Sequence, residues 1–161
     1  EMRRLIWATL LVVLLWTTQA HALRIGEAAP DFILNSTMGE IALSKALEKG
    51  PVVLALYPNN FTPRCTTELL AFQKDLDRFK ELNGQVVGVN ADTLENHRAF
   101  AAKLKLEFPL LVDDGTIRKE YGKGRITYLI DQSGIIRFLY KGMPINEQFL
   151  RELAYWQEQK S

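Results

Sequence analysis

The chain has one cysteine, Cys65, and its surroundings are the first place where this sequence could support chemistry. The stretch before it reads Pro58-Asn59-Asn60-Phe61-Thr62-Pro63-Arg64. Thr62 is a favourable N-cap residue, and Pro63 suits the first position of a helix. Cys65 would then lie in the first helical turn, and we expect the Thr62 hydroxyl to lie close to the thiol. A thiol at a helix N-terminus is a candidate nucleophile, because the helix dipole favours the thiolate.

The helix end alone does not make such a thiol reactive. A free thiol, with a pKa of about 8.5, is only slightly ionised near neutral pH. Lowering that value to about 6 takes about 3.4 kcal/mol. A helix N-terminus supplies about 0.3–1 kcal/mol, or about 2 kcal/mol when partly buried. A guanidinium about 4 Å away is worth about 4 kcal/mol at an effective dielectric constant near 20. A reactive Cys65 therefore requires an arginine beside it.

Several other chemistries lack the residues that they need. One cysteine excludes an intrachain disulfide and a multi-cysteine zinc site, and two histidines, His21 and His97, are too few for a histidine-rich metal centre. A net charge of +1 without a long basic run argues against nucleic-acid binding. We therefore expect no metal and no cofactor. His97 falls on an apolar helix stripe and is interpreted as a residue at the edge of the core. Asp113-Asp114-Gly115 is interpreted as a turn and helix start rather than a cation site.

The elements that must position Cys65 alternate along the chain. Short apolar runs predict buried strands at 52–57, 85–91 and 108–112. Apolar residues at helical spacing predict a helix from Thr62 to a stop near Asn83-Gly84, a second helix capped by Thr93, and a last helix over 146–160. The runs 125–130 and 135–140 predict an antiparallel hairpin. This order predicts an α/β domain with a mixed central β-sheet flanked by helices. A thioredoxin-like arrangement fits it, although the pattern alone does not distinguish that fold from other small α/β domains.

The first 22 residues are interpreted as a signal peptide, with Glu1 as an added residue before Met2, and residues 23–161 as one domain. Two arginines precede an apolar run at 5–16, and small residues follow at positions 20 and 22. The run is shorter than the ~20 residues that a membrane span needs. We expect an exported protein, periplasmic or extracellular, or a membrane-anchored one if the segment is not cleaved. In an oxidising compartment a lone thiol is a buried small hydrophobe, half of an interchain bridge, or a reactive group.

The residues around Cys65 resemble those of a known family. Pro58-x-x-x-Thr62-x-x-Cys65 matches the P-x-x-x-T-x-x-C motif of peroxiredoxins. The longer string LYPNNFTPRCTTEL resembles the subgroup called bacterioferritin comigratory protein or peroxiredoxin Q. The resemblance continues through VVGVNAD, HRAFAAKLKLEFPLLVDD, YG and RITYLIDQSG, so it covers nearly all of residues 23–161. Glu68, three residues after the cysteine, and Arg125, at the start of RITYLID, add to its specificity.

The resemblance implies a thioredoxin-like fold and a thiol peroxidase that reduces hydrogen peroxide or alkyl hydroperoxides. Cys65 would attack the peroxide as a thiolate, and Thr62 would hydrogen-bond the peroxide and the sulfur. Pro58 would keep the thiolate from water. Arg125 would be the cation that the thiolate requires and would polarise the peroxide. Glu68 would orient an arginine rather than take part in bond making.

The sequence also departs from the subgroup. Many members carry a resolving cysteine five residues after the first, where this chain has Leu70, so an internal disulfide step is out of reach. The reductant would then be an external thiol: a small thiol, or a thioredoxin-like or glutaredoxin-like protein. Arg64 stands where glycine is common, with an effect on the thiol that we do not predict. We expect a monomer or a weak homodimer.

Two other functions are considered. A thioredoxin-like disulfide reductase normally needs Cys-x-x-Cys, and Glu68 occupies the matching position, which argues against it. A redox sensor or binding module that has kept the pocket but lost turnover stays open as the alternative.

Overall fold

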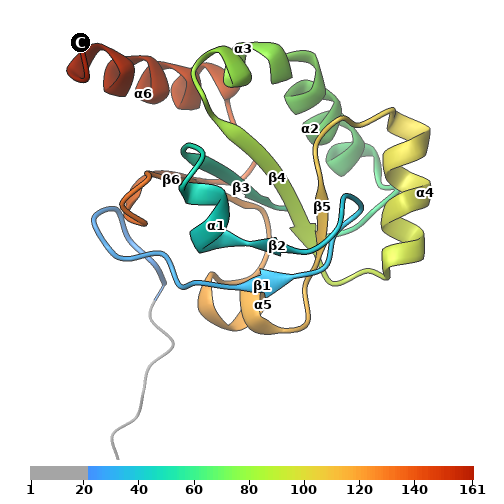
Figure 1. The fold of residues 1–161 in the computed structure, drawn as a ribbon. Helices are drawn as coiled ribbons and strands as arrows, with labels where there is room; N and C mark the ends of the chain where they lie inside the picture. The colour runs from blue at the N-terminus through green and yellow to red at the C-terminus, as the bar shows by residue number, and fades with distance from the viewer. Residues whose placement is uncertain (1–21) are drawn as a thin grey trace, which may run out of the picture.

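The computed structural model describes residues 22–161 (Figure 1). The expected signal peptide lies outside these residues except for Ala22, so both that segment and the domain boundary after it remain predictions. Within residues 22–161 no helix is long and apolar enough to cross a membrane.

A five-stranded mixed sheet forms the centre of the structure, with its strands in the order β5-β4-β3-β6-β7. The strands are β3 (Val52–Leu56), β4 (Gln85–Asn90), β5 (Leu110–Val112), β6 (Ile126–Ile130) and β7 (Ile136–Lys141). β3 runs parallel to β4, and β4 parallel to β5, whereas β6 is antiparallel to both β3 and β7. These strands confirm the predicted runs and the predicted hairpin, with ends that differ by one or two residues.

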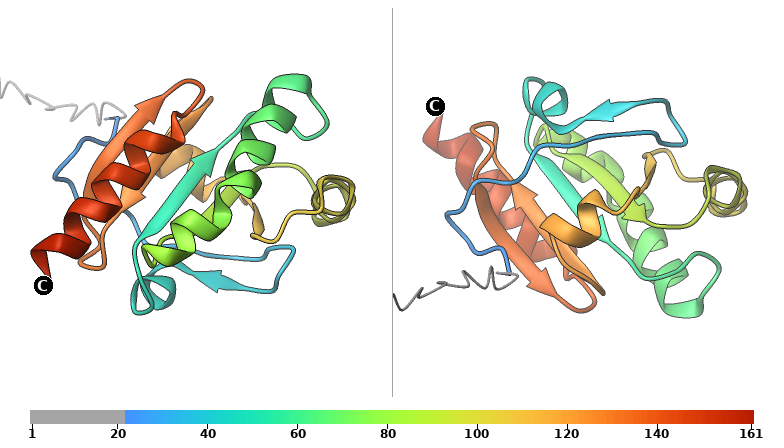
Figure 2. Two further views of the ribbon diagram at one scale, coloured as in Figure 1. Left: turned by 90° about the horizontal axis from the view of Figure 1, so that it is seen from above. Right: turned by 90° about the horizontal axis from the view of Figure 1, so that it is seen from below.

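Helices cover both faces of this sheet (Figure 2). On one face lie α2 (Pro63–Lys74), α3 (Leu76–Glu81) and α6 (Asn146–Gln159), while α4 (Leu94–Leu104) packs beside β5 at the sheet edge. On the other face lie α1 (Leu43–Leu47), α5 (Thr116–Glu120) and a small hairpin of β1 (Ile33–Leu34) and β2 (Ile41–Ala42). The predicted α/β architecture is therefore confirmed.

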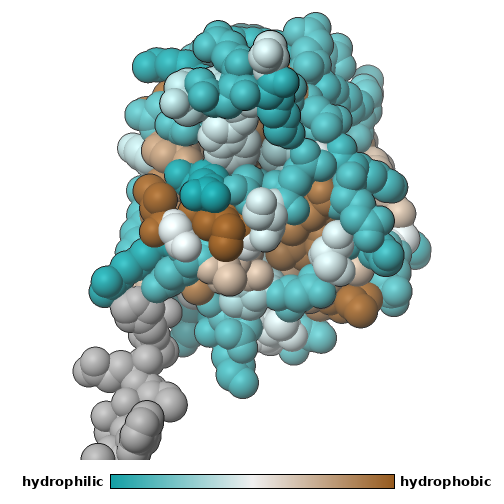
Figure 3. All heavy atoms as spheres, turned by 60° about the vertical axis from the view of Figure 1, so that its left-hand side comes forward, coloured by the Kyte–Doolittle hydropathy of each residue, from teal (hydrophilic) through white to brown (hydrophobic). Residues whose placement is uncertain are grey.

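The central strand β3 contributes to the core on both sides. All five of its residues are buried, and they alternate between two apolar clusters. Val53 and Ala55 pack with Cys65 beneath α2, while Val52, Leu54 and Leu56 pack beneath α1 and α5. This explains the uniformly apolar run, because a strand that is buried on both faces does not alternate between apolar and polar residues. The face of the molecule shown in Figure 3 is mostly hydrophilic, with apolar side chains gathered in a few patches.

The helix predicted from Thr62 to Asn83 is in fact two helices, which is a correction to the sequence interpretation. α2 ends at Lys74, Asp75 leaves the helical conformation, and α3 follows directly. At the junction Asn146, the first residue of α6, donates from Nδ2 to the carbonyl of Ala71 and to the Asp75 carboxylate. A side chain from another helix thus binds a carbonyl in the last turn of α2, a contact that apolar periodicity does not reveal.

Candidate active site

Cys65 lies in the first turn of α2, directly after the loop that leaves the end of β3. As predicted, α2 begins at Pro63 with Thr62 in the N-cap position. The cysteine is only 1% exposed and packs in the apolar cluster between the sheet and α2. The thiol is therefore held in a dry, fixed position at the carboxyl end of a central strand.

Arg125 reaches Cys65 because of the pairing between β3 and β6. Leu56, at the end of β3, pairs with Ile126, at the start of β6, so the residue before Ile126 lies beside the loop that leads to the cysteine. The Nη2 group of Arg125 lies 3.4 Å from Cys65 Sγ. The structure thus places the cation that a reactive Cys65 requires next to the sulfur.

Glu68 holds the other branch of the same guanidinium. Its Oε2 accepts a hydrogen bond from Nη1 of Arg125, and the carboxylate side chain is fully buried. Glu68 lies one helical turn after Cys65 in α2, so both groups project from the same face of that helix. The expected pairing of Glu68 with an arginine is therefore present, and it aims the second branch of the fork at the sulfur.

The buried carboxylate of Glu68 has an unusual electrostatic position. Burial raises its pKa to about 7, against the opposing charge and hydrogen bond of Arg125 and the charge of Arg64. Its second oxygen, Oε1, is buried without a hydrogen-bond partner. Arg64 itself is exposed.

Thr62 does not make the capping bond that the sequence suggested. Its hydroxyl donates to the carbonyl of Asn59 at 3.3 Å, and no N–H of the first turn donates to it. The first backbone bond of α2 runs from Thr66 N–H to the Thr62 carbonyl. The Thr62 side chain bonds instead to a carbonyl three residues back, an interaction within the loop. A role of Thr62 toward peroxide remains a prediction.

Pro58 is exposed where the loop leaves β3. It lines a hollow of about 620 Å³ at the carboxyl ends of β3 and β4, together with polar residues that include Asn59, Asp92 and Lys123. Cys65 is not among the residues that line this hollow. The expected role of Pro58 as a shield for the thiolate also remains a prediction.

A buried polar network that the sequence did not suggest supports the same loop. Asn60, only 7% exposed, accepts at Oδ1 from the Tyr57 hydroxyl at 2.7 Å and from Asn90 Nδ2 at 3.2 Å. Its Nδ2 contacts Asp92 Oδ2 at 3.1 Å and His97 Nδ1 at 2.8 Å. His97, expected at the edge of the core, is completely buried. Asn60 and His97 are 37 positions apart and lie on different elements, so no local pattern in the sequence indicates their contact. Covariation of the two positions among homologous sequences is the kind of signal that could have indicated it.

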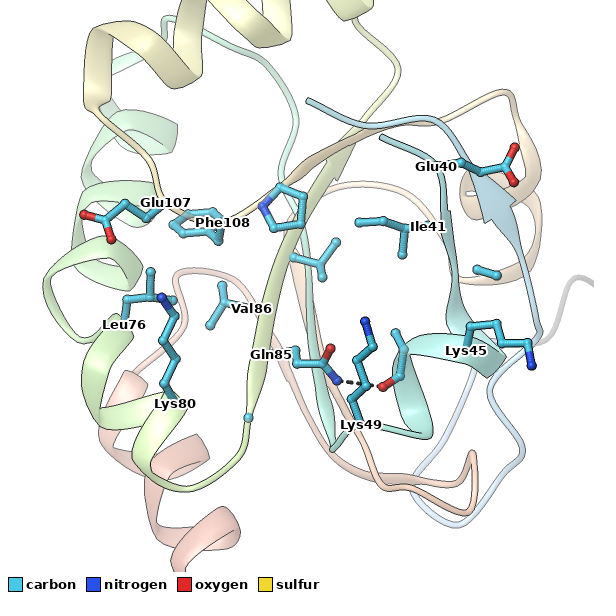
Figure 4. A pocket seen from close by; sticks show the side chains of 15 residues that line it. Glu40, Ile41, Lys45, Lys49, Leu76, Lys80, Gln85, Val86, Glu107 and Phe108 are labelled. Atoms are coloured by element: carbon cyan, nitrogen blue, oxygen red, sulfur yellow. Dashed lines mark hydrogen bonds between the residues drawn. The ribbon is translucent and has the colours of Figure 1, made fainter. Parts of the chain in front are cut away.

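A second hollow, of about 340 Å³, lies between α1 and α3 beside the first half of β4 (Figure 4). Its walls include Val86 and Phe108, and Lys49 and Lys80 extend along it. Neither cysteine nor histidine lines it. Within residues 22–161, no group of three or more His, Cys, Asp or Glu residues is arranged to hold a metal ion.

Comparisons with known proteins identify the family of this chain. Residues 25–139 match the family described as AhpC/TSA. A protein named peroxiredoxin Q, chloroplastic, from Sedum lineare is 39% identical over 138 residues, which cover 79% of this chain and 71% of that protein. Matches to several longer proteins of that name cover 61% or 62% of their length.

Two crystal structures share the fold. Peroxidoxin BcpB from Mycobacterium tuberculosis gives a TM-score of 0.78 at 28% identity, and covers 84% of this chain and 98% of its own. A cysteine-to-serine mutant of PrxQ from Xylella fastidiosa gives 0.77 at 27% identity, covering 85% and 98%. These likenesses confirm the expected thioredoxin-like fold.

Proposed function

The chain belongs to the AhpC/TSA family, and we propose that this thiol-dependent peroxidase reduces peroxides through the thiolate of Cys65. The observation that carries the assignment is the contact of 3.4 Å between Arg125 Nη2 and Cys65 Sγ. A guanidinium at that distance favours the charged form of the sulfur, and Glu68 fixes its orientation from the other side.

The reaction is a displacement at oxygen. The thiolate of Cys65 donates an electron pair to one oxygen of the peroxide, an S–O bond forms, and the O–O bond breaks. The leaving oxygen keeps the pair from the broken bond and takes a proton from solvent, so hydrogen peroxide gives water and an alkyl hydroperoxide gives an alcohol. The sulfur is oxidised by two electrons to a sulfenic acid. Arg125 stabilises the negative charge as it moves from sulfur to the leaving oxygen.

Resetting the enzyme requires a thiol from outside this chain. Cys65 is the sole cysteine in the sequence, and Leu70, five residues later on α2, is 42% exposed. A first external thiol condenses with the sulfenic acid, forming a disulfide and releasing water. A second thiol then displaces Cys65 as its thiolate and leaves the external pair oxidised. A small thiol, or a thioredoxin-like or glutaredoxin-like protein, supplies the right chemistry.

A turnover experiment tests this function. With peroxide alone, we expect one rapid turnover per protein, followed by inactivation as more peroxide converts the sulfenic acid to sulfinic acid. Dithiol supplied together with the peroxide gives continuous turnover, because it reduces Cys65 before the irreversible sulfinic step, and mass spectrometry follows the oxidation state of Cys65. Cys65→Ser is the control and should show neither phase. Sustained peroxide reduction without any thiol would refute the mechanism. A sulfenic acid that no dithiol reduces would favour a redox sensor instead.

We also propose that the protein is exported after cleavage behind Ala22, and that it acts as a monomer or weak homodimer. The basic start, the apolar run and the small residues at positions 20 and 22 support export. Cell fractionation combined with the N-terminal mass of the isolated protein tests it. A chain that keeps its first 22 residues and is recovered in the cytoplasm would refute it.

A further inference from the structure

The loop of residues 58–62, between β3 and α2, determines where Cys65 lies, and two consecutive residues attach it to α4. Asn60 contacts His97 at 2.8 Å, and the ring of Phe61 packs on Phe100 with centroids 4.9 Å apart. His97 and Phe100 are three residues apart on α4, so they lie on one face of that helix. That face of α4 is the support on which the loop rests.

The loop needs this support, because part of it adopts an unfavourable backbone conformation. Phe61 has a φ of 62°, in the left-handed region of the backbone, which residues other than glycine and asparagine seldom adopt. Such a conformation persists only where surrounding contacts impose it. The contacts that hold it include the tilted packing of Phe61 on Phe100, the Lys103 ammonium 5.7 Å from the centroid of the Phe61 ring and, one residue earlier, the hydrogen bonds of Asn60.

The partners of Asn60 determine which way its amide points. An ionised carboxylate only accepts hydrogen bonds, so the end of Asn60 that faces Asp92 must be the NH₂ group. That same nitrogen lies 2.8 Å from His97 Nδ1, which must therefore be an acceptor. His97 Nε2 lies 2.8 Å from the carbonyl of Leu111, which also only accepts, so Nε2 carries the proton. The ring is thus neutral, with one defined tautomer.

A second proton on His97 is incompatible with this arrangement. It would sit on Nδ1 and face the Asn60 NH₂ group, so that two donors would oppose each other. Rotating the Asn60 amide would not relieve this, because its oxygen would then face the Asp92 carboxylate and its nitrogen would face the Asn90 NH₂ group. The loop would have to leave His97.

The surroundings of His97 agree with a neutral ring. Burial lowers its pKa, although the backbone hydrogen bonds at Leu111 and Asn90 and the charge of Asp92 act in the opposite direction. The hydroxyl of Tyr57, the residue directly after β3, also stays neutral, because burial raises its pKa far above the usual value. Asp92 is therefore the one permanent charge among the described groups of this network.

We propose that neutral His97 is a positioning residue, which holds Asn60 and thereby the loop that presents Cys65, and that protonation of His97 releases the loop and slows peroxide reduction. The inference rests on the proposed function for its effect on rate, but its effect on the loop is independent of catalysis. An unanchored His97 binds a proton below about pH 6.5. Below that value the population of released loop rises by up to about tenfold per pH unit, until the anchored form is protonated as well.

The loop itself is tested by hydrogen exchange on the wild-type protein between pH 5 and 8. The protection factor of the Thr66 amide, which donates to the Thr62 carbonyl at the end of this loop, should fall on acidification once it is corrected for the intrinsic effect of pH. Amides in β3 should keep theirs. Nitrogen NMR of the His97 ring should show a proton on Nε2 alone at pH 7. Protection that does not change down to pH 5, or a proton on Nδ1 at pH 7, would overturn the inference.

The effect on rate is tested with variants compared at each pH, because protonation of the thiolate slows every variant alike. His97→Asn keeps an acceptor near Asn60 but does not titrate. The double variant Asn60→Asp/Asp92→Asn exchanges the two side chains, so that a carboxylate at position 60 accepts from protonated His97 while an amide at position 92 donates to it. For both, the ratio of the variant's rate constant with peroxide to that of wild type should rise as the pH falls. Arg98→Gln, at an exposed position of α4, is the control and should give a constant ratio.

The two proposals fail in different ways. If wild type reduces peroxide but both variants give a constant ratio, the positioning role is wrong and the function stands. If wild type does not reduce peroxide while loop protection still falls with pH, the function is wrong and the anchoring by His97 stands. A variant that does not fold removes only its own comparison, because the exchange experiment uses the wild-type chain.

Discussion

Replacing Arg125 by alanine tests the electrostatic argument most directly. At 3.4 Å from Cys65 Sγ, its charge is worth about 5 kcal/mol at an effective dielectric constant near 20. That figure is an upper bound, because the thiolate regains solvation when the arginine is removed. Hydrogen bonds to charged groups contribute about 1.5–3 kcal/mol net. At 1.4 kcal/mol per tenfold change, the rate constant of Cys65 with peroxide should fall by between about 10- and 100-fold.

The same substitution also leaves Glu68 buried without its partner, which lowers stability and complicates the comparison. The double variant Arg125→Ala/Glu68→Gln removes that buried charge. It should recover thermal stability relative to Arg125→Ala while its reaction with peroxide stays slow. Arg125→Lys keeps the positive charge but lacks a guanidinium that can contact both Glu68 and Cys65. Its rate constant with peroxide should therefore lie between those of wild type and Arg125→Ala.

Stopped-flow tryptophan fluorescence measures the reaction with peroxide, and iodoacetamide alkylation at the same pH measures the amount of thiolate. Both rates should fall in Arg125→Ala. Arg118→Ala, at an exposed position of α5, is the control. If the folded double variant reacts with peroxide as fast as wild type, the charge of Arg125 does not activate the sulfur and the reasoning is wrong.

Three further predictions follow from particular contacts. Glu68→Gln keeps the charge of Arg125 beside the sulfur and weakens only its orientation, so its reaction with peroxide should slow by more than its alkylation does. Because the pKa of Glu68 rises to about 7 on folding, from about 4.3 unfolded, wild type should lose thermal stability relative to this variant as the pH rises from about 4.3 to about 7; an increase would contradict the assignment. Thr62→Val, which removes no capping bond, should change the free energy of unfolding by less than about 0.5 kcal/mol, yet react with peroxide more slowly than Thr62→Ser; equal rates would exclude a catalytic hydroxyl. Thr93→Ala removes the bond from Asn96 N–H to the Thr93 hydroxyl and should cost about 1 kcal/mol in urea unfolding, with the peroxide rate at pH 7 unchanged; a slower rate would mean that the start of α4 contributes more to the site than we infer.

The sequence predicted those parts of the fold that depend on long apolar patterns. The strand at 52–57 is such a case, because burial on both faces leaves a continuous apolar run. The hairpin of β1 and β2 escaped prediction, because strands of two residues have no measurable period. It is fixed instead by contacts such as the bond from Ser44 N–H to Asp31, across thirteen positions.

The candidate site likewise has features that the sequence predicted and features that it did not. The requirement for a cation beside Cys65 came from the energetics of the thiolate, while the choice of Arg125 came from family resemblance, since spacing alone relates no residue to another 60 positions away. Thr62 is the N-cap residue as predicted, but its expected side-chain capping bond was wrong, because the hydroxyl bonds to the Asn59 carbonyl within the loop instead. Asn60 was missed because an asparagine in a loop is common, and only the fold brings it to its four partners, Tyr57, Asn90, Asp92 and His97.

The register between β3 and β6 makes chemical reactivity a measure of completed folding. Cys65 and Arg125 become neighbours only when Leu56 pairs with Ile126 across two antiparallel strands. A chain in which α2 has formed but β6 has not yet joined the sheet has an ordinary thiol, with no guanidinium to activate it. During refolding, the onset of rapid oxidation by dilute peroxide should therefore coincide with the docking of β6 rather than with the appearance of helix. Cys65 is therefore unreactive in incompletely folded chains. Such chains are protected from the irreversible oxidation to sulfinic acid that an activated thiolate undergoes.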